Sequence, residues 1–176
     1  MELRTELPEG FEASYEDGVL VVEGEGNEVS KKLEHALIEV EVDGDEVVFS
    51  TEESKRNVQS IVKTFQSHLD NMLDGLKDDH VYRMKGVYAH FPMTVKTQND
   101  QVVIENFMGE RNPRKIDIAD GVTVEVDGDD LTVRGPDKEL VGLTAGRIEQ
   151  ACKKRNRDPR TFQDGIYITE KGDKSE

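Results

Sequence analysis

The sequence contains an internal repeat. The hexapeptide VEVDGD occupies residues 40–45 and again residues 124–129, an offset of 84 residues. Similar apolar segments surround both copies in the same order, since Leu20-Val21-Val22 is matched by Val102-Val103-Ile104 at an offset of 82. In a chain of 176 residues, each copy is long enough for one small domain with its own core. The repeat therefore predicts two similar small domains.

An amphipathic helix is predicted after each hexapeptide. Two sets of residues share the spacings 3, 1, 3 and 4 at an offset of 83: Val58, Ile61, Val62, Phe65 and Leu69, and then Val141, Thr144, Ala145, Ile148 and Cys152. These spacings place one apolar stripe on one face of a helix. We expect the first helix to begin with a capping box from Ser50 to Glu53 and to stop at Gly75.

The remainder of each copy is interpreted as strands. The Asp-Gly pairs stand between alternating apolar residues, which is typical of a tight hairpin turn. Gly86-Val87-Tyr88 and Gly165-Ile166-Tyr167 are interpreted as equivalent strands that each follow a helix. The expected fold class is α+β: an internal duplication of two similar small domains, each an antiparallel sheet packed against one amphipathic helix. We place the domains at residues 1–79 and 80–176.

A calcium loop is the alternative interpretation of VEVDGD. An EF-hand loop needs alternating oxygen ligands over about twelve residues, with glycine at about the sixth. Here glycine comes second in Asp43-Gly44-Asp45-Glu46, and apolar Val47-Val48-Phe49 follows at once. The pattern favours a hairpin over a calcium site. The corresponding alternative function is an acidic soluble module that binds a protein partner or a divalent ion through its Asp-Gly turns.

The charge of the chain is strongly acidic and unevenly distributed. The net charge is −15, with 38 acidic and 23 basic residues. Residues 1–79 carry 21 acidic and 7 basic residues, whereas residues 80–176 carry 17 and 16. Adaptation to molar salt is one interpretation, because the Debye length there falls to about 3 Å; a very soluble protein is the other. With no apolar run of about 18 residues and no signal peptide, we expect a cytoplasmic chain with no membrane partner.

No residue pattern indicates an enzyme, a cofactor or a metal site. Cys152 is the only cysteine, which excludes an internal disulfide and a cysteine-rich zinc site. Its basic neighbours would favour a thiolate if it were exposed, but the repeat matches it to Leu69 on the buried stripe. Core packing is therefore favoured over a thiol enzyme. The four histidines are scattered, and no glycine-rich phosphate loop follows a strand.

A basic segment interrupts the acidic sequence at residues 147–160. Six basic residues stand there against Glu149 and Asp158, and further basic residues lie in the RNPRK segment at 111–115. The segment begins where the second helix is predicted to end, so it could be a solvated helix end favoured by the helix dipole. Alternatively, its Arg and Lys side chains could grip RNA phosphates, and Arg could stack on unpaired bases.

The residues around this segment resemble the universal large-subunit ribosomal protein "L six" family, in its archaeal and eukaryotic form. The motif Q-x6-R-x2-R-x-F-x-D-G-I-Y-I-x2-K runs from Gln150 to Lys171. The stretch VYAHFP at residues 87–92 and the duplication also look like the family. The strong acidity is similar to that of a halophilic archaeal member.

The resemblance implies a non-enzymatic constituent of the large ribosomal subunit. It implies that large-subunit ribosomal RNA binds chiefly to the C-terminal domain, near the region where translational GTPases dock, with neighbouring ribosomal proteins as further partners. It also implies that Phe162 and Tyr167 pack their strand to the domain, and that Gly165 permits a turn or a close backbone approach. The candidate RNA-binding residues are Lys153, Lys154, Arg155, Arg157, Arg160, Lys171, Arg111, Arg114 and Lys115.

Overall fold

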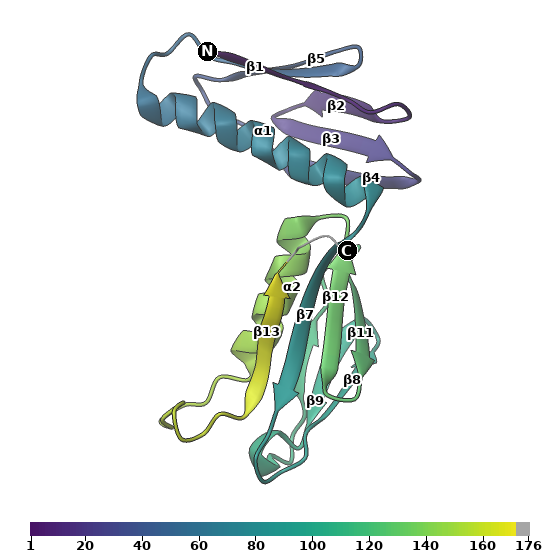
Figure 1. The fold of residues 1–176 in the computed structure, drawn as a ribbon, viewed down its shortest axis with the longest axis vertical. Helices are drawn as coiled ribbons and strands as arrows, with labels where there is room; N and C mark the ends of the chain where they lie inside the picture. The colour runs from purple at the N-terminus through teal and green to yellow at the C-terminus, as the bar shows by residue number, and fades with distance from the viewer. Residues whose placement is uncertain (172–176) are drawn as a thin grey trace. The chain divides into compact units, whose positions relative to one another are not determined.

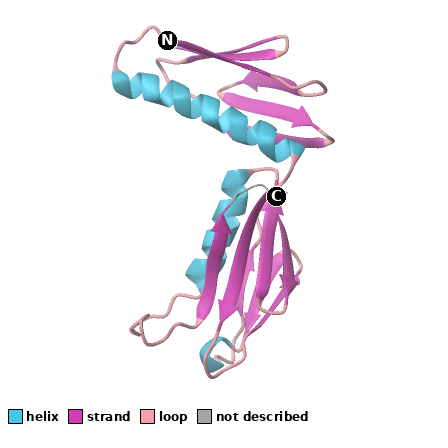
Figure 2. Ribbon diagram, viewed as in Figure 1, coloured by secondary structure: helices cyan, strands magenta, loops and turns pink. Residues whose placement is uncertain are grey.

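The computed structural model describes residues 1–171 and divides the chain into two compact units, Met1–Asp78 and Asp79–Glu176. Each unit combines one long helix with antiparallel strands (Figures 1 and 2). Within the described residues, neither helix is long and apolar enough to cross a membrane. The α+β class and the duplication are thus confirmed, and the structure adds that each unit divides its strands between two sheets.

The N-terminal unit packs two three-stranded sheets, ordered β1-β6-β5 and β2-β3-β4, against α1 (Arg56–Lys77). Its strands are β1 (Glu2–Glu6), β2 (Glu12–Glu16), β3 (Val19–Gly24), β4 (Asn27–Lys32), β5 (Glu39–Asp43) and β6 (Glu46–Ser50). The helix packs against strands of both sheets. Alternate residues of β3 and β6, such as Leu20 and Phe49, join Leu69 of α1 in a fully buried core, as the period-2 and period-3.6 patterns predict.

The C-terminal unit packs a four-stranded sheet, ordered β11-β12-β7-β13, and a three-stranded sheet, ordered β10-β9-β8, against α2 (Lys138–Ala151). Its strands are β7 (His80–Val87), β8 (Thr94–Gln98), β9 (Gln101–Glu105), β10 (Arg114–Asp117), β11 (Thr123–Asp127), β12 (Asp130–Gly135) and β13 (Gly165–Lys171). A short 3-10 turn, η1 (Phe107–Gly109), connects β9 to β10. The helix packs against β7, β10, β12 and β13.

Both VEVDGD segments form hairpins, as predicted. Asp43 pairs with Glu46 across the β5–β6 turn, and Asp127 pairs with Asp130 across the β11–β12 turn. Each turn contains two residues, of which the first is a glycine at φ +61°. Glycine adopts this left-handed conformation without a steric penalty, which explains why the hexapeptide carries it in both copies.

The predicted helical stripes are correct, whereas the predicted ends of α1 are wrong. Every stripe residue is buried except Ile61, which is partly buried. Ser50 cannot cap the helix because it pairs in β6 with Glu2 and Glu39; α1 begins at Arg56 instead, without a side-chain cap. Gly75 lies buried within the last turn of α1.

The interpretation of the strands that follow the helices is also wrong. β7 follows α1 but belongs to the C-terminal unit, where Gly86 pairs with Ile166 and Val87 pairs with Gly165. The two segments that were matched as copies are therefore neighbours in one sheet. The order β1-β6-β5 corresponds to β7-β12-β11, so β13 has no counterpart in the sheets of the N-terminal unit. This strand and the loop before it are what the second copy adds.

Candidate nucleic-acid interface

Residues 147–151 of the basic segment end α2, and the rest of the segment lies in a long loop between α2 and β13, which we define as the basic loop, residues 152–164. Asp137 caps the N-terminus of α2, because its Oδ1 accepts hydrogen bonds from the backbone N–H groups of Glu139 (2.9 Å) and Leu140 (3.3 Å). Cys152 at the end of α2 and Ile166 at the start of β13 are both buried in the core. The basic loop is therefore anchored at both ends and faces solvent between them.

Arg114 fixes the first part of the basic loop. Its guanidinium donates two hydrogen bonds to the Glu110 carboxylate, at 2.8 and 2.6 Å. The same guanidinium donates to the backbone carbonyls of Ala151 and Lys153, which lie at the open C-terminal end of α2. It also lies 4.4 Å from the ring centroid of buried Phe107. A cation here complements the negative end of the helix dipole and ties β10 and η1 to α2.

The η1 turn that carries Phe107 has an unusual backbone. Asn106 (φ +58°), Met108 (φ +50°) and Gly109 (φ +79°) all adopt the left-handed conformation. For residues other than glycine this conformation costs on the order of 1 kcal/mol or more. The turn is held by the burial of the Phe107 side chain and by a 3.0 Å hydrogen bond from the Asn106 amide to the carbonyl of Pro92.

The middle of the basic loop is held by its own cations. Lys154 donates to the backbone carbonyl of Phe162, and the Arg157 guanidinium lies 4.9 Å from the Phe162 ring centroid. Asp158 accepts hydrogen bonds from the backbone N–H (2.9 Å) and Nε (3.2 Å) of Arg160. Two of the predicted phosphate ligands, Lys154 and Arg157, thus also shape the loop.

Tyr167 fixes the end of the basic loop. Its hydroxyl donates to the carbonyl of Gln163 at 2.8 Å, and its ring covers Gly165, where an added Cβ would lie 3.2 Å from the ring. Burial raises the pKa of this hydroxyl above its usual value. The close approach expected at Gly165 is therefore made by a side chain. Phe162 and Tyr167, which the family resemblance places against the domain, are partly exposed, at 37% and 39%, and Tyr167 packs on Gly165 of its own strand.

A cleft of about 830 Å³ opens between the basic loop and the η1 turn. It is lined by Met108, Glu110, Arg114, Gln150, Ala151, Lys153, Lys154, Arg155 and Arg157. Hydrogen bonds from Arg114 neutralise the single carboxylate of this set and hold the pKa of Glu110 below its usual value. Among the described residues, Lys153 and Arg155 form no ion pair with a carboxylate. The cleft is consequently cationic.

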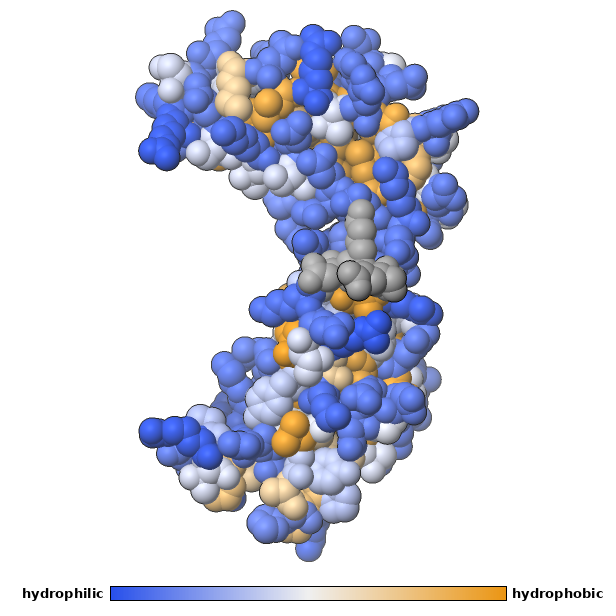
Figure 3. Space-filling view, in the orientation of Figure 1, coloured by the Kyte–Doolittle hydropathy of each residue, from blue (hydrophilic) through white to orange (hydrophobic). Residues whose placement is uncertain are grey.

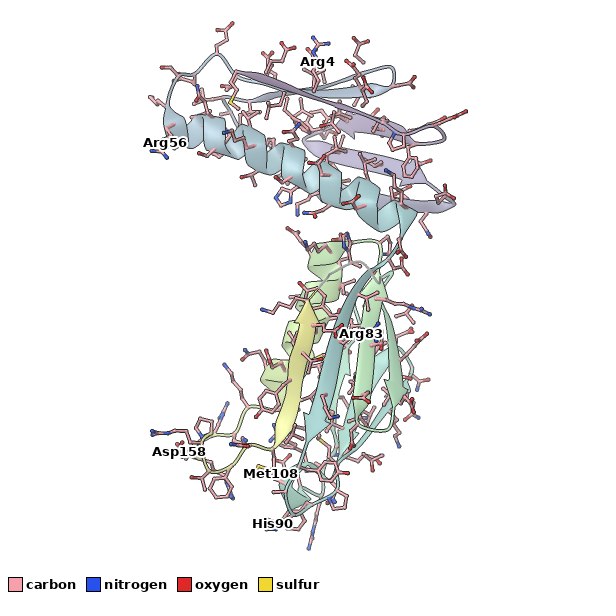
Figure 4. All side chains as sticks on the ribbon, viewed as in Figure 1. Arg4, Arg56, Arg83, His90, Met108 and Asp158 are labelled. Carbon is pink, nitrogen blue, oxygen red and sulfur yellow. The ribbon has the colours of Figure 1, made fainter. Side chains whose placement is uncertain are left out.

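The other predicted site residues, Arg111, Arg160, Lys115 and Lys171, do not line this cleft. Arg111 is exposed in the turn before β10, and Arg160 projects from the basic loop with its side chain 90% exposed. Asp158 marks this loop in Figure 4, which also labels Met108 and His90 at the same end of the unit. Lys115 lies on β10 beside the exposed side of α2. Lys171 is separated from the others because it is the last residue of β13, whereas the basic loop leads into the first residue of that strand, Gly165.

Cys152 is confirmed as a core residue. It is 3% exposed, and burial raises the pKa of its thiol from 9.0 to about 11. Its basic neighbours therefore fail to produce a thiolate at neutral pH, because desolvation outweighs their attraction. In the part of the chain that the structure describes, no cluster of three or more His, Cys, Asp or Glu side chains could hold a metal ion.

Sequence reasoning missed Glu110 and Met108, which line the cleft opposite the basic loop, and Phe107, which supports Arg114 from below the surface. Glu110 and Arg114 have the i, i+4 spacing of a helical ion pair, but the segment between them is not helical. Phe107 is an aromatic residue beside a predicted strand, and nothing in its neighbourhood marks it as a support for a cation. Only the three-dimensional contact reveals their role.

The fold and the site together define a class of protein: a duplicated α+β chain with a cationic cleft at one end of its second unit. Comparison with known proteins identifies the family. The model for ribosomal protein L6 matches residues 7–79 and 91–165, once in each copy of the repeat, and the chain belongs to this family.

Several relatives match almost the whole chain. The large ribosomal subunit protein uL6 of Haloarcula marismortui is 45% identical over 94% of this chain and 93% of its own length. Proteins of the same name from Natronomonas pharaonis (40% identical, 100% and 99% covered) and Methanospirillum hungatei (41%, 95% and 95%) are also similar. The chain is therefore a structural ribosomal protein and not an enzyme, and it is a component of the cytoplasmic ribosome. The halophilic relatives agree with its acidity.

Proposed function

We propose that this chain, as a constituent of the large ribosomal subunit, binds large-subunit ribosomal RNA mainly through its C-terminal unit. The observation that carries the proposal is the cationic cleft between the basic loop and the η1 turn. It lies in the half of the chain where basic and acidic residues nearly balance, and four of its cations come from the basic loop, which the other copy lacks. Phosphate groups are the polyanion that such a set of Lys and Arg side chains fits.

The predicted phosphate ligands divide into two roles under this proposal. Lys153, Arg155 and Arg160 make the main contacts, with Arg111, Lys115 and Lys171 at outlying points of the RNA-binding face. Lys154, Arg157 and above all Arg114 shape the cleft, because their cationic groups already contact Phe162, Phe107 or Glu110. The N-terminal unit, with its large excess of carboxylates, faces solvent or a neighbouring ribosomal protein.

The salt dependence of RNA binding tests the main contacts. Each phosphate contact adds about 0.7 to 0.9 to the slope of log affinity against log salt concentration. Replacing Lys153 and Arg155 by Gln should therefore lower this slope by about 1.4 to 1.8 and weaken binding at low salt. The measurement is filter binding to large-subunit ribosomal RNA of Haloarcula marismortui over a range of KCl concentrations.

The matched control removes two exposed cations of α1, Arg56 and Lys63, by the same Lys/Arg→Gln changes (Figure 4 labels Arg56). The change in net charge is equal, so a general electrostatic effect would weaken binding equally in both variants. An unchanged slope in the Lys153/Arg155 variant, or an equal loss in the control, would refute the C-terminal binding site.

Proximity to the factor-binding region is the second part of the proposal, and it rests on family membership. Crosslinking mass spectrometry of large subunits with a bound translational GTPase is the test. Crosslinks between the GTPase and this chain are expected. Their absence, when crosslinks to other proteins of the subunit are found, would contradict this placement.

A further inference from the structure

Exposed aromatic side chains gather at one end of the C-terminal unit. Eight large apolar side chains are exposed among the described residues, and five of them lie at the end where β7 stops and β13 starts: Val87, Tyr88, Phe91, Phe162 and Tyr167. Figure 3 shows orange and pale residues among blue ones at this end of the unit. Isolated exposed apolar residues are ordinary, but a group of them marks an interaction surface.

We call the four aromatic residues of this group the aromatic end: Tyr88, Phe91, Phe162 and Tyr167. Phe91 lies against the η1 turn, where an added Cβ at Gly109 would be 3.3 Å from its ring. Tyr167 covers Gly165, which pairs with Val87 next to Tyr88. Phe162 carries Arg157 on its ring. Through Phe91 and Phe162, the aromatic end therefore lies beside the η1 turn and the basic loop, which both line the cationic cleft.

We propose that the aromatic end binds unpaired bases of the ribosomal RNA by stacking, while the cations of the adjoining cleft hold the phosphates of the same nucleotides. This inference rests on the proposed RNA-binding function and adds the class of RNA structure that is recognised. Exposed rings beside Arg and Lys are the arrangement with which proteins hold single-stranded RNA. A protein partner fits less well, since Lys is depleted at protein interfaces and the adjoining cleft is lined by Lys153 and Lys154.

The acidity of the chain gives an independent reason for stacking. Phosphate contacts lose affinity steeply with salt: six of them lose on the order of 10⁴-fold for each tenfold rise in salt concentration, at a slope of about 0.7 per contact. A chain with a net charge of −15, suited to molar salt, cannot rely on phosphate contacts alone. Base stacking depends little on salt because no counterions are released. It therefore supplies affinity for RNA that persists at high salt concentration.

Tyr88 is the side chain to change first. It is 39% exposed and lies outside both hydrophobic cores, so its replacement should leave the fold intact. Tyr88→Leu keeps an apolar side chain but removes the ring, and Tyr88→Phe keeps the ring. We expect Tyr88→Leu to lower affinity for Haloarcula marismortui large-subunit RNA by about 5- to 150-fold, the range for one lost stacked base. The loss should be equal at 0.2 and 2 M KCl, and Tyr88→Phe should bind normally.

The control variant is Leu143→Ala, which removes an exposed apolar side chain from α2. Ultraviolet crosslinking is a second readout: the wild-type chain should crosslink to bases through a peptide that contains Tyr88 and Phe91. Normal affinity of Tyr88→Leu together with no such crosslink would overturn the inference, even if subunit assembly were impaired, because that result would indicate a protein partner. If the Lys153/Arg155 variant also bound normally, the proposed function itself would fail.

Discussion

At the residue scale, Cys152 connects the core to the candidate site. It is the last residue of the buried stripe of α2 and the first residue of the basic loop. Because burial raises the pKa of its thiol from 9.0 to about 11, the folded chain keeps a proton that the unfolded chain releases. This contribution to the free energy of unfolding is complete below about pH 9 and is lost as the pH rises toward 11. We expect a loss of about 2 to 3 kcal/mol across that interval.

The test compares the wild-type chain with Cys152→Ala by urea unfolding in 2 M KCl at pH 7.5 and 10.5. Other groups titrate in this range in both proteins, so only the difference between the two pH-dependent losses reports the thiol. The variant should be less stable at pH 7.5 because of the smaller side chain, but it should lose about 2 kcal/mol less on going to pH 10.5. Equal losses would show that the thiol ionises alike in folded and unfolded chains.

At the scale of elements, the ion pair between Arg114 and Glu110 joins β10, the segment after η1 and the end of α2. Arg114 on β10 contacts Glu110 after η1 and the carbonyls at the end of α2. If Arg114 bound phosphate, Glu110 would compete with the RNA, and Glu110→Gln would strengthen binding. Because we assign Arg114 to positioning, we expect Glu110→Gln to weaken RNA binding by about tenfold, the equivalent of one charged hydrogen bond of about 1.5 kcal/mol.

The matched control for Glu110→Gln is Glu105→Gln in the same unit, which removes a carboxylate that pairs with Lys96 at 2.7 Å. Filter binding at one KCl concentration suffices, since the two assignments of Arg114 predict effects of opposite sign. Stronger binding by Glu110→Gln would return Arg114 to the phosphate ligands. Equal effects of both variants would attribute the change to net charge alone.

The elements also show what the sequence could and could not predict. The stripes of α1 and α2 and both Asp-Gly hairpins depend on local periodicity and turn chemistry, and they were predicted correctly. The partners of a strand depend on distant segments, so Gly86-Val87 and Gly165-Ile166 were mistaken for copies when they are neighbours. Similarly, the charge of Arg114 was visible in the sequence, but its commitment to Glu110 and Ala151 was not.

At the scale of the whole molecule, the two copies of one fold have diverged in charge. Residues 1–79 carry three acidic residues for each basic one, whereas the second copy is nearly balanced and carries the cationic cleft. The cost of this acidity is visible in the sheet β2-β3-β4, where Glu12 pairs with Glu23 and Glu23 pairs with Glu28. Like charges that lie directly opposite on neighbouring strands destabilise a sheet.

Salt should therefore stabilise the N-terminal unit more than the C-terminal unit, and Glu23→Gln should replace part of that effect. We expect this change to raise the stability of the N-terminal unit by about 1 kcal/mol at 0.2 M KCl, and by much less at 2 M, where the Debye length is about 3 Å or shorter. Hydrogen exchange of α1 and α2 reports each unit separately. Glu2→Gln is the control, because Glu2 pairs with Arg4 at 2.7 Å and its loss relieves no repulsion from a paired strand. An effect of Glu23→Gln that is equal at both KCl concentrations would mean that local packing, and not the carboxylate row, limits the acidic unit at low salt.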